Sequence, residues 1–193
     1  MGKLKTFLTI SILTIVASSC EEESYIPKPP TYLRLELPDH TYKTHTDDCA
    51  YTFDIADLYE VNAAPVDQNG NACHKRIDLG PLNGTAYLRY WKISEPLAYY
   101  INNANDEIDR HKLKATNIVD KQIIRADDKV YGTFFELQGN VATPYQFYLT
   151  DSTDNFVYCE VLFNSTPNYD SLIPTLDYLE RDLMQLVETL KWK

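Results

Sequence analysis

The sequence lacks an apolar run long enough to cross a membrane as a helix. Its main apolar stretch, FLTISILTIVA, covers residues 7–17 and ends at two serines, whereas a transmembrane helix needs about 20 consecutive apolar residues. The sequence also lacks a basic excess, because 18 Lys and Arg residues stand against 28 Asp and Glu residues, a formal net charge of −10. Since nucleic acid is bound mainly through Lys and Arg, we expect no nucleic-acid partner.

Motifs that carry catalysis by themselves are also missing. The sequence contains no Gly-rich phosphate-binding loop, no nucleophile elbow and no paired metal-binding histidines. Internal repeats with a period of about 20 to 50 residues are absent as well, which argues against a solenoid. We therefore expect a protein that is not an enzyme and that needs no cofactor, no metal ion and no small-molecule substrate.

The first 20 residues have the layout of a bacterial export signal. Two lysines precede the apolar stretch 7–17, and small residues follow it. Residues 17–20, Ala-Ser-Ser-Cys, fit a lipobox in which alanine replaces the usual leucine. The sequence therefore predicts a lipoprotein signal peptide at residues 1–19 and lipidation of Cys20. The alternative is an ordinary signal peptide that leaves Cys20 as a free thiol.

A proline-rich spacer follows the predicted lipid site. Residues 20–31 include Pro27, Pro29 and Pro30, which favour extended polyproline geometry at about 3.1 Å per residue. Acyl chains contribute about 0.8 kcal/mol per buried methylene, so several chains hold a protein to a bilayer. We expect a protein of the cell envelope whose folded domain, residues 32–193, is held away from the membrane by this tether.

Three further cysteines allow one disulfide and one free thiol. Cys159 lies in the segment 155–164, where alternation places Val157, Cys159 and Val161 on the same face of a strand. It is therefore expected to behave as a small buried apolar residue. Cys49 and Cys73 flank a loop-rich segment and are the natural pair, which predicts a disulfide between them.

Alternation of apolar and polar residues predicts a mostly antiparallel sheet of about six to eight strands. Short turns separate the last four predicted strands, as an antiparallel meander requires. The predicted strands cover residues 31–38, 51–55, two stretches within 75–93, 118–126, 129–139, 143–151 and 155–164.

Two stretches have helical rather than strand periodicity. Apolar residues recur at helical spacing between Pro96 and Ala115, and again in an amphipathic stripe near the C-terminus. Asp170 or Ser171 is expected to cap the C-terminal helix, with Pro174 in its first turn. With the sheet, a mid-chain helix and a C-terminal amphipathic helix predict one α+β domain.

Two polar clusters suggest sites that compete with simpler explanations. The turn TDSTDN, residues 150–155, has the acids of a calcium loop or of an acid–base pair, Asp151 and Asp154, but its composition is typical of a tight turn. A second cluster contains potential zinc ligands whose spacing matches no regular zinc motif. Its members are His40, His45, Asp47, Cys49 and His74.

Several segments follow one another in a fixed order along the chain: residues 25–29, 32–38 with His40 and Tyr42, Cys49 with Tyr51 and Phe53, 110–112, Lys114 with Ala115, 146–152, 167–172 with Pro174, and 191–193. Together they resemble one known family, the GldD family of gliding-motility lipoproteins. The chain departs from the family pattern at Ala50, where proline is expected, and at His74, where an aromatic residue is expected.

The resemblance implies a non-catalytic, lipid-anchored part of the gliding machinery, functionally tied to type IX secretion. Its implied partners are other gliding or type IX secretion envelope proteins, and its implied location is the outer membrane, with the periplasmic face and the cell surface both left open. The 15 tyrosines suit protein contact surfaces. An alternative is a surface-exposed lipoprotein that binds a glycan or an adhesin, because Glu21–Glu23 resemble an export-to-surface signal of such bacteria.

A modification site is also implied by resemblance. The tripeptide Asp151-Ser152-Thr153 is similar to the short acceptor pattern of envelope O-glycosylation in such bacteria. This implies that Ser152 carries a glycan. Asp170-Ser171-Leu172 fits the same pattern, but Ser171 is expected to cap a helix.

Overall fold

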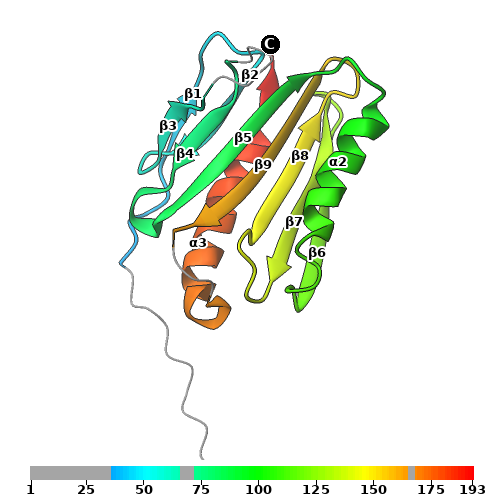
Figure 1. Cartoon of the computed structure of the whole chain (residues 1–193). Coiled ribbons are helices and arrows are strands. Elements are labelled where there is room, and N and C mark those ends of the chain that lie inside the picture. Colours follow the sequence, from blue (N-terminus) through cyan, green and yellow to red (C-terminus); the bar gives the residue numbers. More distant parts are fainter. Residues whose placement is uncertain (1–35, 66–71, 165–167) are drawn as a thin grey trace, which may run out of the picture. The chain divides into compact units, whose positions relative to one another are not determined.

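A seven-stranded antiparallel sheet forms the centre of the computed structural model, which describes residues 36–65, 72–164 and 168–193 (Figure 1). The strand order is β3-β4-β5-β9-β8-β7-β6, and β6, β7, β8 and β9 form the predicted meander. The number of strands lies within the range predicted from the sequence. The strands are β3 (Glu60–Ala63), β4 (Lys75–Asp78), β5 (Gly84–Lys92), β6 (Asn117–Arg125), β7 (Val130–Gln138), β8 (Tyr145–Thr150) and β9 (Asn155–Phe163).

A small three-stranded sheet joins the two ends of the described chain. It has the order β1-β2-β10, with β1 at Tyr42–His45, β2 at Tyr51–Ala56 and β10 at Lys191–Trp192. Both outer strands run antiparallel to β2. The Trp192 indole also donates a hydrogen bond to the carbonyl of Lys129, at 3.0 Å. The C-terminus is therefore fixed by main-chain pairing and by a side-chain contact.

Two helices cover opposite faces of the large sheet (Figure 1), as the alternation in β9 requires. Phe156 and Tyr158 pack with residues of α2 (Leu97–Asp109), such as Tyr100. Cys159 and its neighbours on the other face pack with the leucines of α3 (Tyr169–Thr189). A 3-10 helix, η1 (Gly80–Leu82), connects β4 and β5. The predicted α+β fold, with helices in mid-chain and near the C-terminus, is confirmed.

The first predicted strand is not found where it was expected. Residues 31–35 of this segment lie outside the described residues, and Glu36–Thr41 have no strand structure. Pro38 has no N–H to donate to a ladder, and Leu37 packs against the main core without a strand partner. The first strand begins instead at Tyr42, where the chain pairs with β2.

Both helices differ from the prediction at their ends. Pro96 is the N-cap of α2 rather than a helical residue. The C-terminal helix begins earlier than expected, at Tyr169, whose N–H donates to the side-chain oxygen of Asn140 at 3.0 Å. Neither Asp170 nor Ser171 is the cap, and Pro174 lies in the second turn, where its missing N–H removes one helical hydrogen bond.

Candidate functional site

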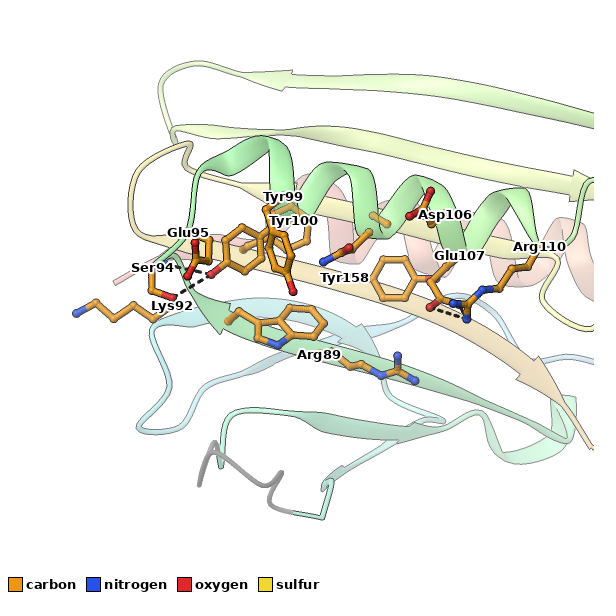
Figure 2. Close-up of a pocket in the computed structure, with 14 residues that line it drawn as sticks. Arg89, Lys92, Ser94, Glu95, Tyr99, Tyr100, Asp106, Glu107, Arg110 and Tyr158 are labelled. Carbon is orange, nitrogen blue, oxygen red and sulfur yellow. Dashed lines mark hydrogen bonds and ion pairs between the residues drawn. The ribbon is translucent and has the colours of Figure 1, made fainter.

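An elongated cleft runs between α2 and the outer face of β5 and β9, with a volume of about 740 Å³. We call it the α2 cleft. Figure 2 shows its side chains rising from the sheet and descending from the helix toward one another. Because α2 connects β5 to β6 at the far edge of the sheet, it crosses the neighbouring strands and leaves this space beside them. The lining residues that matter here are Arg89, Trp91, Lys92, Tyr99, Arg110 and Tyr158.

Aromatic rings form the middle of the α2 cleft. Tyr99 is 55% exposed and packs edge-on against Tyr100, with ring centroids 5.4 Å apart. Trp91 and Tyr100 each pack against the ring of Phe156 in the floor. The Tyr100 hydroxyl accepts a hydrogen bond from the backbone N–H of Ser94 at 3.1 Å. Large rings thus remain accessible while their neighbours hold them in place.

Charged side chains of both signs surround these rings. Arg110 pairs with Glu107 at 2.8 Å at one end of the α2 cleft, and Lys92 stands at the other end (Figure 2). Arg89 pairs with Glu160 in the neighbouring strand. Counted over the lining, three basic residues (Arg89, Lys92 and Arg110) balance three acidic residues (Glu95, Asp106 and Glu107). The lining therefore has no net charge, in contrast to the acidic chain as a whole.

Sequence reasoning did not identify the α2 cleft. The alternation of β5 placed Arg89 and Trp91 on a common face, which was the available signal. The opposite wall, however, comes from α2, and β9 lies beside β5 only because of a pairing between strands far apart in the sequence, such as Leu88 with Cys159. This juxtaposition depends on the sheet order and not on any local pattern.

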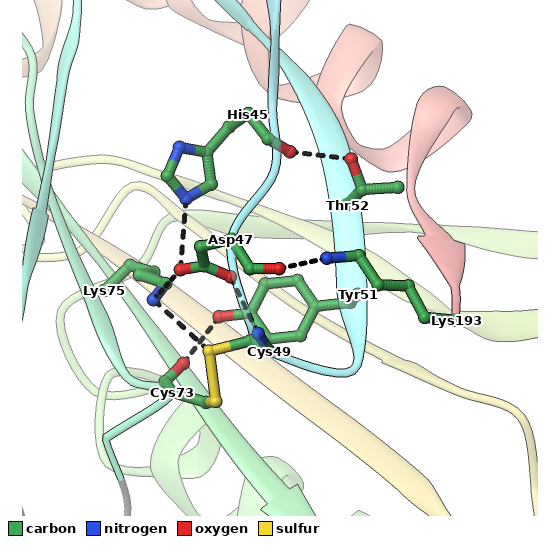
Figure 3. Close-up of polar contacts among 8 residues, drawn as sticks. All are labelled: His45, Asp47, Cys49, Tyr51, Thr52, Cys73, Lys75 and Lys193. Atoms are coloured by element: carbon green, nitrogen blue, oxygen red, sulfur yellow. Dashed lines mark hydrogen bonds and ion pairs between the residues drawn. A yellow bond between two sulfur atoms is a disulfide. The ribbon is translucent and has the colours of Figure 1, made fainter.

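A disulfide joins Cys49 and Cys73, with Cα atoms 5.5 Å apart, as the sequence predicts. Figure 3 shows it within a polar cluster, which we call the disulfide cluster. Lys75 is a buried residue, only 5% exposed. Its ammonium group lies 2.5 Å from the Asp47 carboxylate and 3.4 Å from the sulfur of Cys49. The Tyr51 hydroxyl donates to the carbonyl of Cys73 at 2.6 Å. The disulfide thus ties the loop before β2 to the start of β4.

Electrostatics in the disulfide cluster favour an ionised Asp47. Burial raises the pKa of this carboxyl group, but hydrogen bonds from Lys75 and from the backbone of Cys49 outweigh it, so the pKa is lowered overall. Burial lowers the pKa of His45, whose Nε2 lies 3.6 Å from the same carboxylate. The Lys193 ammonium donates to the backbone carbonyl of Asp47 (Figure 3). The C-terminus therefore closes this cluster.

The structure does not bring the possible zinc ligands together. Cys49 is in the disulfide, His40 contacts Asp182, and His74 Nδ1 accepts the backbone N–H of Tyr90 at 3.0 Å. Among the residues that the structure describes, no group of three or more His, Cys, Asp or Glu side chains is arranged to hold a metal ion. The zinc hypothesis therefore does not match the observed geometry.

The turn at residues 150–155 uses its acid to hold its own backbone. Asp151 Oδ1 accepts the N–H groups of Thr153, Asp154 and Asn155 at 2.8–2.9 Å. Burial raises the Asp151 pKa, but these hydrogen bonds outweigh it and lower the pKa overall. The carboxylate therefore stabilises the backbone of a tight turn, which disfavours the calcium-loop and acid–base alternatives. Ser152 is exposed at the tip, with φ +70°.

A buried carboxylate on α3 was not predicted. Asp182 is fully buried, and its Oδ1 lies 2.6 Å from His40 Nδ1 and accepts the Tyr42 hydroxyl at 3.1 Å. Oδ2 accepts the Tyr59 hydroxyl at 2.6 Å. Burial, together with Asp182, raises the pKa of Tyr42 to about 12, so Tyr42 remains a donor at neutral pH. We call these four residues the Asp182 cluster.

The sequence itself contained a signal for this buried acid. Asp182 follows Leu179 by three residues and precedes Leu186 by four, so it lies on the apolar stripe of the helix. A charge on a buried stripe requires partners, which His40, Tyr42 and Tyr59 provide. The Asp182 cluster therefore attaches the first described segment of the chain to α3.

The predicted lipid site, Cys20, lies outside the described residues. Within the part of the chain that the structure describes, no helix combines the length and apolar character needed to cross a membrane.

Comparison with known proteins assigns a family. No curated protein matched the chain. The family model described as gliding motility lipoprotein GldD matches residues 22–192, nearly the whole chain. The resemblance seen in the sequence is thereby confirmed, and the chain belongs to the GldD family of gliding motility lipoproteins.

Proposed function

We propose that this protein is a lipid-anchored, non-catalytic component of the gliding motility machinery, functionally linked to type IX secretion, and that it acts through protein–protein contacts. The observation that carries the proposal is the family match over residues 22–192. A rigid domain in which sheet, helices and disulfide are tied together is suited to an assembly part, since such a part must keep its shape under load.

The proposed anchor is a set of acyl chains on Cys20. Residues 1–19 are the proposed signal peptide, residues 20–31 the tether and residues 32–193 the domain, and the outer membrane is the proposed location. Support comes from the description of the family as lipoproteins. Mass spectrometry of the N-terminal peptide from native membranes tests the anchor. A peptide that begins at Cys20 and carries acyl groups is expected, and an unmodified thiol there would contradict the proposal.

We propose that the protein is not an enzyme, because the carboxylate of Asp151, the acid that most suggested catalysis, is used in hydrogen bonds within its own turn. A hydrolase that used Asp151 and Asp154 would lose function on replacement of both by Asn while its stability stayed unchanged. We expect instead that the double variant loses stability, because the Asp151 carboxylate accepts hydrogen bonds from three N–H groups of its own turn. A stable but non-gliding double variant would favour the hydrolase.

The proposed partners are other gliding or type IX secretion envelope proteins. Chemical crosslinking in gliding cells, followed by affinity purification of the tagged chain, tests this directly. Proteins of these two systems are expected to be recovered from cells that carry the full-length chain, and not from cells in which the tag is fused to the signal peptide and tether alone. Equal recovery from both strains would mean that the folded domain makes no specific contact.

A second candidate function is a surface-exposed lipoprotein that binds a glycan or an adhesin. The α2 cleft favours it, because exposed rings and charged groups gather there. Protease treatment of intact cells separates the two locations. Cleavage without lysis indicates the cell surface, whereas protection indicates the periplasmic face and contradicts the surface exposure that this candidate requires.

Ser152 is the proposed acceptor of an O-linked glycan. Its exposure at the tip of the β8–β9 turn leaves the hydroxyl open to a modifying enzyme. Ser171, in the same short sequence pattern, is half-buried in the first turn of α3 and provides a matched control within the chain. A mass increase on the Ser152 peptide, abolished by Ser152→Ala and unaffected by Ser171→Ala, is expected. An unmodified Ser152 peptide from native cells would contradict the proposal.

A further inference from the structure

The α2 cleft combines accessible aromatic rings with side chains that both donate and accept hydrogen bonds. We propose that it binds a neutral oligosaccharide. The inference develops the glycan-binding candidate above by naming the ligand class of the α2 cleft, and it does not depend on the role in the gliding machinery. It also applies on either side of the outer membrane. A volume of about 740 Å³ is within the usual range of ligand clefts, about 300–1,000 Å³.

The rings provide surfaces on which sugar rings can stack. The face of an aromatic ring is electron-rich, so it attracts the weakly positive C–H groups on the apolar face of a pyranose. Tyr99 is 55% exposed, and the half-buried Trp91 lines the same cleft. Since Phe156 supports both Trp91 and Tyr100 from below, the floor is already ordered before a ligand arrives. Stacking would therefore cost little side-chain entropy.

The charges in the α2 cleft favour a ligand without net charge. Arg89, Lys92 and Arg110 can donate hydrogen bonds, while Glu95, Asp106 and Glu107 can accept them. Sugar hydroxyls both donate and accept, so they can use both sets. An anionic ligand would meet three carboxylates, and a cationic ligand would meet three basic groups. The balance therefore points to a neutral, hydroxyl-rich ligand.

The shape of the α2 cleft favours an oligomer over a single sugar. Lys92 and Glu95 stand at one end, and Glu107 and Arg110 stand at the other (Figure 2). Aromatic rings occupy the space between these ends. A chain of linked sugars could stack along the rings while its hydroxyls reach the charged groups at both ends.

An extended peptide fits the α2 cleft less well, because the strands beneath it offer few free main-chain groups. β5 and β9 pair residue by residue from Gly84↔Phe163 to Lys92↔Asn155, and β9 pairs with β8 on its other side. Peptides that bind by strand addition need an open sheet edge. In this part of the described structure, recognition therefore has to come from side chains, as it does for most sugars.

Tryptophan fluorescence can test the proposal on the full-length protein, purified in a detergent without a sugar headgroup. The chain has two tryptophans, Trp91 and Trp192. Trp192 lies in β10 of the small sheet, so a Trp192→Phe background leaves Trp91 in the cleft as the emitter. The probes are the neutral tetrasaccharides of β-1,4-linked N-acetylglucosamine, cellulose and starch, with a heparin tetrasaccharide as the charged comparison.

A saturable change with at least one neutral probe, and a weaker or absent change with heparin, is the expected result. Tyr99→Ala should weaken binding about tenfold, because it removes one stacking ring. The matched control is Leu113→Ala, a change at a residue that is 98% exposed and outside the lining. It should leave binding unchanged.

Three results would overturn the proposal: no saturable response to any neutral probe, tighter binding of heparin, or equal affinity in the Tyr99→Ala protein. Failure in this assay would leave the machinery role standing, because that role is tested by crosslinking in cells. A Tyr99→Ala protein that binds sugar normally but loses its crosslinked partners would instead identify the α2 cleft as a protein contact.

Discussion

At the scale of single residues, Asp182 is the most informative position in the chain. A carboxylate inside a protein is costly unless it has hydrogen-bond partners. Asp182 has three of them, from three different parts of the chain: the segment before β1, β1 itself and the β2–β3 turn. His40 also stacks on Tyr178, with ring centroids 4.0 Å apart. The segment nearest the proposed tether is thereby attached to α3.

Replacing Asp182 by Ala should therefore destabilise the protein strongly. The change leaves polar groups of His40, Tyr42 and Tyr59 without their acceptor, and we expect a loss of about 3 kcal/mol or more in the free energy of unfolding. Urea unfolding followed by circular dichroism measures it. Asp177→Ala, at an exposed position of the same helix, should change stability by less than about 0.5 kcal/mol. Equal losses in the two variants would show that the Asp182 cluster contributes nothing specific.

Asp151 provides a second test, with a defined pH dependence. In the wild type, the Asn155 side-chain amide donates to Asp151 Oδ2 at 2.6 Å. Asp151→Asn keeps one acceptor oxygen but replaces the other with an NH2 group, which cannot accept this hydrogen bond. We expect a loss of about 1–2 kcal/mol at pH 7. Because the Asp151 pKa is lowered in the folded state, its contribution is present above the unfolded pKa of about 3.9 and is lost as the pH falls through the folded value.

The difference in unfolding free energy between wild type and Asp151→Asn should therefore decrease in acid. Chemical unfolding at a series of pH values from about 7 to about 2.5 measures this difference. Asp154→Asn is the matched control, since Asp154 is exposed in the same turn. A stability difference that stayed constant over this range would mean that folding does not lower the pKa of Asp151.

At the scale of elements, the disulfide connects two short, loop-rich regions. Its partners are 24 residues apart in the sequence, and the four-residue strands β3 and β4 lie close to it in the chain. In the chain-entropy model, closing a loop of this size contributes about 3 kcal/mol. Little regular structure would otherwise hold this part of the domain.

A Cys49→Ala/Cys73→Ala double variant should consequently lose about 3 kcal/mol of unfolding free energy. Addition of a thiol reductant should lower the stability of the wild type by a similar amount and leave the double variant unaffected. The second measurement separates loss of the bond from loss of packing by the sulfur atoms. If reductant had no effect on the wild type, the disulfide would not contribute in the way proposed.

The elements that sequence analysis identified are those whose signals are local. Strands β6 to β9 were predicted because short turns separate them, and their neighbours in the sequence are also their neighbours in the sheet. Strands β1, β3 and β10 have four residues or fewer. β1 and β3 pair with the strands that follow them but are too short for a clear alternation, and β10 depends on pairing with the distant β2.

The same distinction holds for the sites. The disulfide followed from counting cysteines and from recognising the strand around Cys159, which is indeed fully buried. The α2 cleft did not follow, because it requires β5, β9 and α2 to meet. For α3, the apolar stripe was correct, but its start depended on Asn140, a contact from another turn. Local periodicity predicts elements, whereas their ends and the spaces between them depend on tertiary contacts.

At the scale of the whole molecule, the described body is tied together at both of its ends. The Asp182 cluster attaches the N-terminal side to α3, and the C-terminal residues pair with β2 and reach the disulfide cluster. Both ends of the described chain are therefore held by contacts to elements distant in the sequence. This is consistent with a lipid-anchored part of a machine that moves cells.

The most direct test of this account is the gliding speed of native cells in which the only copy of the chain carries Cys20→Ser. The account predicts that these cells do not glide when the variant is exported in normal amounts, because the domain is no longer held at the membrane. Normal gliding by cells whose variant protein is unacylated and recovered in the soluble fraction would contradict it.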